Sequence, residues 1–129
     1  MTYKILVVDD EPDVREALQR KLMREGYGVV TAVDGEEAIA KMASENPDIL
    51  LLDLNLPGCN GFDVLKTVRE KYNDRWRPVI IVSARQELEA TKKCYELEAD
   101  HYLTKPCGME HVLEGIQTMI SLMPLRMKA

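Results

Sequence analysis

The sequence ILVVDDEP occupies residues 5–12 and joins two kinds of local structure. Its first four residues are all apolar and β-branched or leucine, which is typical of a strand buried on both faces of a parallel sheet. Three acidic residues then interrupt the apolar run. Pro12 suits the first turn of a helix, where its missing N–H is not needed. The stretch therefore predicts a buried strand that leads through an acidic turn into a helix.

The same unit of strand and helix recurs along the whole chain. Strict alternation of this kind predicts an α/β fold, a doubly wound parallel sheet with helices on both faces. We expect one domain over 1–123, and a tail or the start of a linker over 124–129. The predicted strands after the first are 29–33, 49–52, 78–82 and 102–103; helices are predicted after Pro12, Asp34 and Asn60, over about 87–97, and from Met109 onward.

Composition excludes several classes of protein. The net charge is −5 with both signs interspersed, whereas general nucleic-acid binding needs a basic face. No apolar run approaches the roughly 20 residues of a membrane span, and the first residues do not resemble a signal peptide. Cys59, Cys94 and Cys107 lack metal-ligand spacing and fit reduced thiols. We expect a cytoplasmic domain that contacts neither membrane nor nucleic acid directly.

Candidate site residues follow four of the five predicted strands. These are Asp9 and Asp10 after the first strand, Asp53 after the third, Ser83 after the fourth and Lys105 after the fifth. Right-handed connections place the carboxyl ends of all the strands along one edge of the sheet, where such folds bind ligands. Taken alone, an Asp at a strand end would more often be a solvated turn residue, Lys105 a surface cation and Ser83 a helix cap. Their convergence from four strands favours a site.

Three carboxylates at one edge cannot all stay charged without cost. Two of them about 4 Å apart repel by roughly 4 kcal/mol at an effective dielectric near 20. Such a cluster shifts its pKa values, spreads into water or binds a hard cation. Oxygen ligands without Cys or His suit Mg²⁺. With Mg²⁺ bound, an incoming phosphoryl group of charge about −2 would no longer be repelled.

Four segments of the chain resemble response-regulator receiver domains. ILVVDDEP at 5–12 resembles their opening, and LLDLNLP at 51–57, continued to Gly61, resembles their phosphoacceptor strand and loop. VSA at 82–84 and YLTKP at 102–106 complete the set. The resemblance covers residues 4 to about 120. It implies the flavodoxin-like strand order 2-1-3-4-5 and a phosphorylatable switch of two-component signalling, with no enzymatic activity beyond its own phosphorylation and dephosphorylation.

The resemblance also implies which residues carry the chemistry. Asp53 would accept a phosphoryl group from a histidine kinase or a phosphotransfer protein. Asp10, Asp53 and the backbone carbonyl of Asn55 would hold Mg²⁺, with Asp9 assisting. This would be phosphoryl transfer by positioning and charge neutralisation.

Three further residues would respond to the phosphoryl group. In the resemblance Lys105 binds one phosphoryl oxygen and Ser83 binds another, after which Tyr102 turns inward. The surface formed by the helix at 87–97, the strand at 102–103 and the last helix would then change. A downstream output domain or partner protein would read that change.

Several positions depart from the family pattern. Leu56 stands where Met is usual, and Cys107 stands where Phe is common. Glu98 stands where Gly is usual, so we expect that the turn into the fifth strand can differ. The resemblance also predicts a cis peptide bond between Lys105 and Pro106.

Two alternatives stay open at this point. A metal-dependent phosphatase with an Asp nucleophile would usually carry an Asp-x-Asp pair on its first strand, whereas here the third strand offers Asp53-Leu54-Asn55. Turnover of a phosphate ester would identify it. A flavin carrier of the same fold needs a phosphate-binding loop after the first strand, where Asp9 and Asp10 would repel phosphate. A coloured purified protein would identify that class.

Overall fold

The computed structural model describes residues 2–126, in which five strands alternate with five α-helices. The short third helix continues into a π-helical turn, η1. In chain order the elements are β1 (Lys4–Val8), α1 (Pro12–Arg24), β2 (Gly28–Ala32), α2 (Gly35–Glu45), β3 (Ile49–Leu52), α3 (Gly61–Lys66), η1 (Thr67–Lys71), β4 (Val79–Ser83), α4 (Leu88–Glu96), β5 (His101–Thr104) and α5 (Met109–Arg126).

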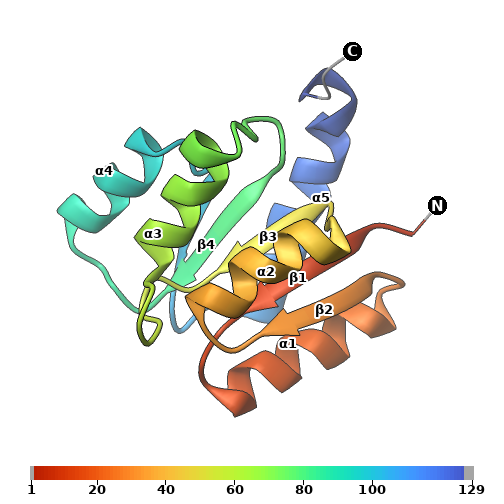
Figure 1. The fold of residues 1–129 in the computed structure, drawn as a ribbon. Helices are drawn as coiled ribbons and strands as arrows, with labels where there is room; N and C mark the ends of the chain where they lie inside the picture. The colour runs from red at the N-terminus through yellow and green to blue at the C-terminus, as the bar shows by residue number, and fades with distance from the viewer. Residues whose placement is uncertain (1, 127–129) are drawn as a thin grey trace.

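All strand pairs in the sheet are parallel, and the strand order is β2-β1-β3-β4-β5. The predicted fold class and strand order are therefore confirmed. The central strands β1, β3 and β4 are almost wholly buried, as expected for strands covered on both faces. Figure 1 shows the sheet running through the middle of the molecule.

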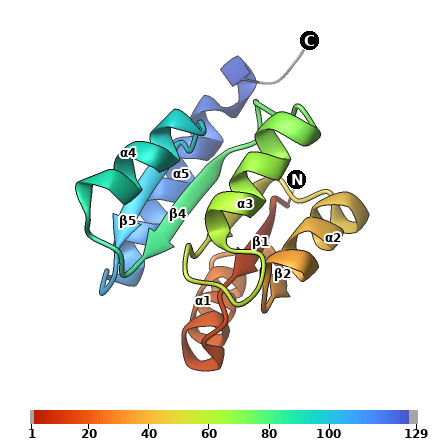
Figure 2. The ribbon, with the colours of Figure 1, turned by 60° about the vertical axis from the view of Figure 1, so that its left-hand side comes forward.

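Two layers of helices cover the sheet. Helices α2, α3 and α4 lie on one face, and α1 and α5 lie on the other (Figures 1 and 2). Successive strand residues point to opposite faces, so β1 contributes to both cores. Leu6 and Val8 pack with α2, α3 and α4, whereas Ile5 and Val7 pack with α1 and α5. The continuous apolar run of β1 thus supplies two separate cores.

Side chains at the helix starts match the sequence signals. Pro12 is the first residue of α1. The Asp34 carboxylate accepts a hydrogen bond from the Glu37 amide at 2.8 Å and caps α2, as its position before Glu37 predicts. Asn60 caps α3 in the same way, from the Asp63 amide at 3.0 Å. Strand boundaries differ from the predicted ones by at most one residue, which is within the ordinary uncertainty of such assignments.

The end of the third helix was not predicted. Residues Thr67–Lys71 form a π-helical turn, closed by the Tyr72 amide donating to the Thr67 carbonyl at 3.0 Å. Arg69 lies in this turn and is only 1% exposed. Its guanidinium donates to the carbonyls of Asp74 and Glu98 and pairs with Asp100 at 3.1 Å. The turn therefore ties the α3–β4 loop to the α4–β5 turn.

The turn between α4 and β5 has its usual form, although Glu98 stands where the family usually has Gly. Glu98 adopts a left-handed conformation, with φ of 67°. The Glu98 amide donates to the Tyr95 carbonyl, and the Ala99 amide donates to the Cys94 carbonyl. This pair of bonds is a Schellman motif, which usually places Gly at that position. The turn into β5 thus has its usual form, at the cost of a less favourable residue.

The last helix continues beyond the predicted domain boundary at 123. Helix α5 extends to Arg126, so residues 124–126 of the predicted tail or linker are helical. Residues 127–129 of that prediction lie outside the described residues. Within residues 2–126, no helix combines the length and apolarity needed to cross a bilayer.

Candidate functional site

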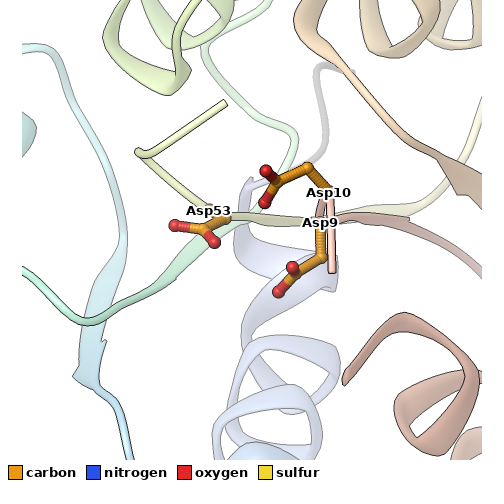
Figure 3. Close-up of side chains that lie close together, drawn as sticks. All are labelled: Asp9, Asp10 and Asp53. Carbon is orange, nitrogen blue, oxygen red and sulfur yellow. The ribbon is translucent and has the colours of Figure 1, made fainter. Parts of the chain in front are cut away.

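Three carboxyl groups gather at the carboxyl edge of the central strands. Asp9 and Asp10 follow β1, and Asp53 follows β3. One carboxylate oxygen from each lies within 4.8 Å of the other two. Figure 3 shows the three side chains close together at this edge. The Asp53 amide donates to the Val8 carbonyl at 3.1 Å, which extends the strand pairing up to the site. The parallel sheet itself therefore places the predicted acidic cluster.

Lys105 bridges two of these carboxylates. Its ammonium lies 2.8 Å from Asp9 Oδ2 and 3.0 Å from Asp53 Oδ2. Burial alone would lower the pKa of Lys105, but the hydrogen bonds to Asp9 and Asp53 outweigh it and raise the pKa above its ordinary value. Lys105 therefore carries its charge at neutral pH. The peptide bond to Pro106 is cis, as predicted.

The cluster retains an excess of negative charge beside Lys105. With every group charged, the three carboxylates and the one ammonium have a net charge of −2. Asp9 and Asp53 are 2% and 4% exposed, whereas Asp10 is exposed. Within the described part of the chain, the Asp10 carboxylate accepts no hydrogen bond from the protein. An all-oxygen donor set with one carboxylate free toward solvent fits Mg²⁺, which takes a few carboxylates and keeps waters.

Backbone amides orient the buried carboxylates. Asp53 Oδ1 accepts from the Asn55 amide at 3.0 Å, and Asp9 Oδ1 accepts from the Glu11 amide, also at 3.0 Å. Asn55 itself is exposed. Each buried carboxylate thus uses one oxygen for its own loop and the other for Lys105. The loop after β3 places Asn55 directly beside the Asp53 side chain.

Among the described residues, neither Ser83 nor Tyr102 forms a hydrogen bond with the carboxylates. Ser83 is fully buried, its carbonyl accepts from the Lys105 amide at 2.8 Å, and its hydroxyl accepts from the Arg85 amide at 3.3 Å. The Tyr102 hydroxyl donates to the Arg85 carbonyl at 2.7 Å. Burial, the largest contribution, raises the pKa of Tyr102, which stays a neutral donor. Both predicted switch residues therefore engage the β4–α4 loop at Arg85.

Two contacts at the site were missed by the sequence analysis. The Arg15 guanidinium, from α1, donates to the Asp9 carbonyl at 2.8 Å. The Phe62 ring lies under two cations, with Arg85 at 5.3 Å and Lys93 at 4.4 Å from its centroid. An arginine one turn after Glu11 was the only signal for the first contact. No sequence pattern signalled the second.

Gly61 allows α3 to begin against the backbone of the Asp53 loop. Its amide donates to the Leu54 carbonyl at 3.0 Å. A Cβ here would overlap the Asp53 carbonyl oxygen and would lie 2.6 Å from the Leu54 Cα. Since these neighbours are backbone, they can give way only by shifting the loop that carries Asp53. Gly61 is therefore a steric requirement of the site.

Replacing Gly61 by Ala should lower the free energy of unfolding by about 1–3 kcal/mol, the usual cost of overpacking. Urea unfolding of the wild-type and Gly61→Ala proteins measures this difference. Gly108→Ala is the matched control, because a Cβ on Gly108 would meet nothing within 4 Å. Equal midpoints for the two variants would contradict the steric argument.

Comparison with known proteins points to one family. The model of the response regulator receiver domain matches residues 5–117. The alkaline phosphatase synthesis transcriptional regulatory protein PhoP of Bacillus subtilis (strain 168) is 39% identical over 120 residues, which are 93% of this chain and 49% of the relative. The chain thus spans about half the length of that regulator.

Solved structures of receiver domains superpose closely on the chain. A receiver domain protein from Methanospirillum hungatei JF-1 gives a TM-score of 0.91 at 27% identity, covering 96% of this chain and 98% of that one. The response regulator TrrA of Thermotoga maritima, in complex with Mg²⁺ and beryllium fluoride, gives 0.82 at 34% identity, covering 92% and 99%.

Proposed function

The chain belongs to the response-regulator receiver domain family, and we propose that Asp53 is the residue on which it is phosphorylated. Receiver domains are signalling switches of two-component systems rather than classical enzymes. Membership of this family therefore argues against the phosphatase and the flavin carrier. The observation that carries the proposal is the environment of Asp53. Its carboxylate is held 3.0 Å from Lys105 and lies beside Asp9 and Asp10.

The acidic cluster supports a Mg²⁺ site in the phosphorylation reaction. Asp10, Asp53 and the Asn55 carbonyl would hold the ion, and Asp9 would assist. Bound Mg²⁺ would supply positive charge for the oxygens of the incoming phosphoryl group. The nucleophile is Asp53. One of its carboxylate oxygens would form the new P–O bond while the P–N bond of the donor's phosphohistidine breaks, and the electron pair of the broken bond would stay on the donor imidazole. Lys105, already oriented toward Asp53, is placed to pair with a phosphoryl oxygen.

A cavity lies beside Lys105, between α1 and α5. This cavity of about 570 Å³ borders Lys105, Pro106 and Cys107, and its walls come from α1 and α5. Burial raises the pKa of the Cys107 thiol. This thiol therefore stays protonated at neutral pH and fits a wall residue rather than a reactive one.

The switch would act through the β4–α4 loop. Ser83 now accepts a hydrogen bond from the Arg85 amide, and Tyr102 donates to the Arg85 carbonyl. If the Ser83 hydroxyl bonded to a phosphoryl group, its bond from the Arg85 amide would weaken. The Arg85 backbone could then shift, which would change the bond between Tyr102 and the Arg85 carbonyl. Different contacts in two states are what a switch requires. The surface of α4, β5 and α5 would then differ between the two forms.

The proposed partners follow from the family and from chain length. A donor kinase or phosphotransfer protein would act at the Asp53 edge. Because the chain spans about half of the Bacillus subtilis regulator, an output domain or a separate partner protein would read the switched surface. We propose no direct contact of this domain with nucleic acid or membrane, and a location in the cytoplasm.

The proposal is tested by phosphorylation with a small acyl phosphate, followed by the intact mass of the protein. With Mg²⁺ present, we expect one added phosphoryl group, labile to base and to hydroxylamine. With the metal removed by a chelator, the added mass should disappear, because the cluster would then repel the donor. Equal labelling in both conditions would contradict the role of Mg²⁺, and no labelling in either would contradict the role of Asp53.

A further inference from the structure

Every polar group of Asp9 has a partner in the protein. Its amide donates to the Ala32 carbonyl at 3.2 Å, and its two carboxylate oxygens accept from the Glu11 amide and from Lys105. Its carbonyl accepts from the Arg15 guanidinium at 2.8 Å. Among these bonds, only the one from Arg15 acts on the peptide unit that joins Asp9 to Asp10.

That peptide unit decides where Asp10 lies. A peptide bond is planar, so the direction of the Asp9 carbonyl sets the direction of the Asp10 amide and the path of the chain to the Asp10 Cα. The Asp10 carboxylate has no protein partner of its own among residues 2–126, and the residue is exposed. Its orientation toward Asp53 therefore depends on the backbone that carries it.

We propose that Arg15 is a positioning residue, which turns the Asp9–Asp10 peptide so that the Asp10 carboxylate faces Asp53 and is preorganised for Mg²⁺. The inference rests on the proposed function for the identity of the ion. Arg15 is half-buried on α1 and touches the backbone rather than any carboxylate. It acts through Asp10 and is not itself a ligand.

Charge and position make opposite predictions for this arginine. The positive charge of Arg15 lies near the acidic cluster, so by Coulomb's law alone its removal would strengthen cation binding. Loss of the bond to the Asp9 carbonyl would instead let Asp10 reorient and would weaken cation binding. Removing residues that orient metal ligands typically weakens affinity about 10–100-fold. The sign of the change in affinity therefore separates the two explanations.

The test measures Mg²⁺ affinity by calorimetry for the wild-type, Arg15→Met and Arg20→Met proteins. Arg20 is exposed on the same helix, so its variant has the same change in net charge. Calorimetry is preferred to tryptophan fluorescence, because Trp76 precedes β4 and so lies at the opposite end of the strands from the acidic cluster. We expect Arg15→Met to bind Mg²⁺ about tenfold more weakly and Arg20→Met to bind as the wild type does.

A second readout needs no metal. In metal-free protein, the Asp10 amide resonance should shift strongly in Arg15→Met and stay in place in Arg20→Met. Affinity in Arg15→Met that equals or exceeds that of the wild type, or an equal loss in both variants, would overturn the positioning role. An unmoved Asp10 amide would overturn it as well. If the wild type binds no Mg²⁺, the metal in the proposed function fails, while the amide shift still decides the role of Arg15.

Discussion

Replacing Asp53 by Asn should abolish phosphorylation by a small acyl phosphate in the presence of Mg²⁺. The Asn amide is a poor nucleophile and removes one negative charge from the proposed metal site. The fold should survive, because the Asn oxygen can still accept from the Asn55 amide, as Asp53 does now at 3.0 Å. Intact mass after a timed reaction should show a full phosphoryl adduct in the wild type and none in the variant.

A matched control comes from the next helix along the chain. Asp63 is exposed on α3, and only its backbone makes the capping contacts there. Asp63→Asn makes the same chemical change and should leave labelling at the level of the wild type. If Asp53→Asn still gained one full phosphoryl group, the phosphoacceptor would have to be another residue. Loss of labelling in Asp63→Asn would show that the assay responds to more than the site.

The carboxyl edge could be predicted because it depends on regular structure alone. Asp53 directly follows four apolar residues, and Asp9 follows a similar run. Once both runs are strands of one parallel sheet, their carboxyl ends lie along the same edge. The structure places the acidic residues together and Lys105 against two of them. Pattern and handedness place these residues along one edge, and the strand order that sets β1 beside β3 came from the family resemblance.

Contacts made by single side chains to loop backbone could not be predicted. Arg15 reaches the Asp9 carbonyl, but a hydrogen bond to a carbonyl leaves no periodic signal in the sequence. The same holds for Gly61. The requirement for glycine there becomes visible only in the structure, where the Asp53 backbone lies against it. The resemblance marked Gly61 as part of a motif without a physical reason. The structure supplies that reason as a close approach of two backbones.

Glu98 illustrates a local rule that its surroundings override. The absence of Gly left the form of this turn open, yet the turn is retained with a left-handed Glu98. Its carbonyl accepts from Arg69 at 3.1 Å, and its carboxylate pairs with Arg75. Bonds from two arginines of the α3–β4 region therefore accompany the strained conformation. Tertiary contacts of this kind are absent from any single stretch of sequence.

Replacing Arg69 by Met should lower the free energy of unfolding by about 3–5 kcal/mol, the usual cost of removing one partner of a buried ion pair. The Asp100 carboxylate is 12% exposed and would lose its bond from the Arg69 guanidinium, while the Val79 amide would still donate to it. The carbonyls of Asp74 and Glu98 would also lose the donor they share. Three acceptors around one buried side chain would thus be left with fewer partners, which is costly inside a protein.

Arg75→Met is the control for this prediction, because it removes an arginine of the same loop whose pair with Glu98 is about half exposed. Exposed pairs contribute about 0–1 kcal/mol, so urea unfolding should separate the two variants clearly. The folded Arg69→Met protein should still bind Mg²⁺ as the wild type does, since Arg69 and Asp100 lie where the strands begin and the acidic cluster lies where they end. If Arg69→Met lost no more stability than Arg75→Met, the buried hydrogen bonds and ion pair of Arg69 would make no measurable contribution to stability.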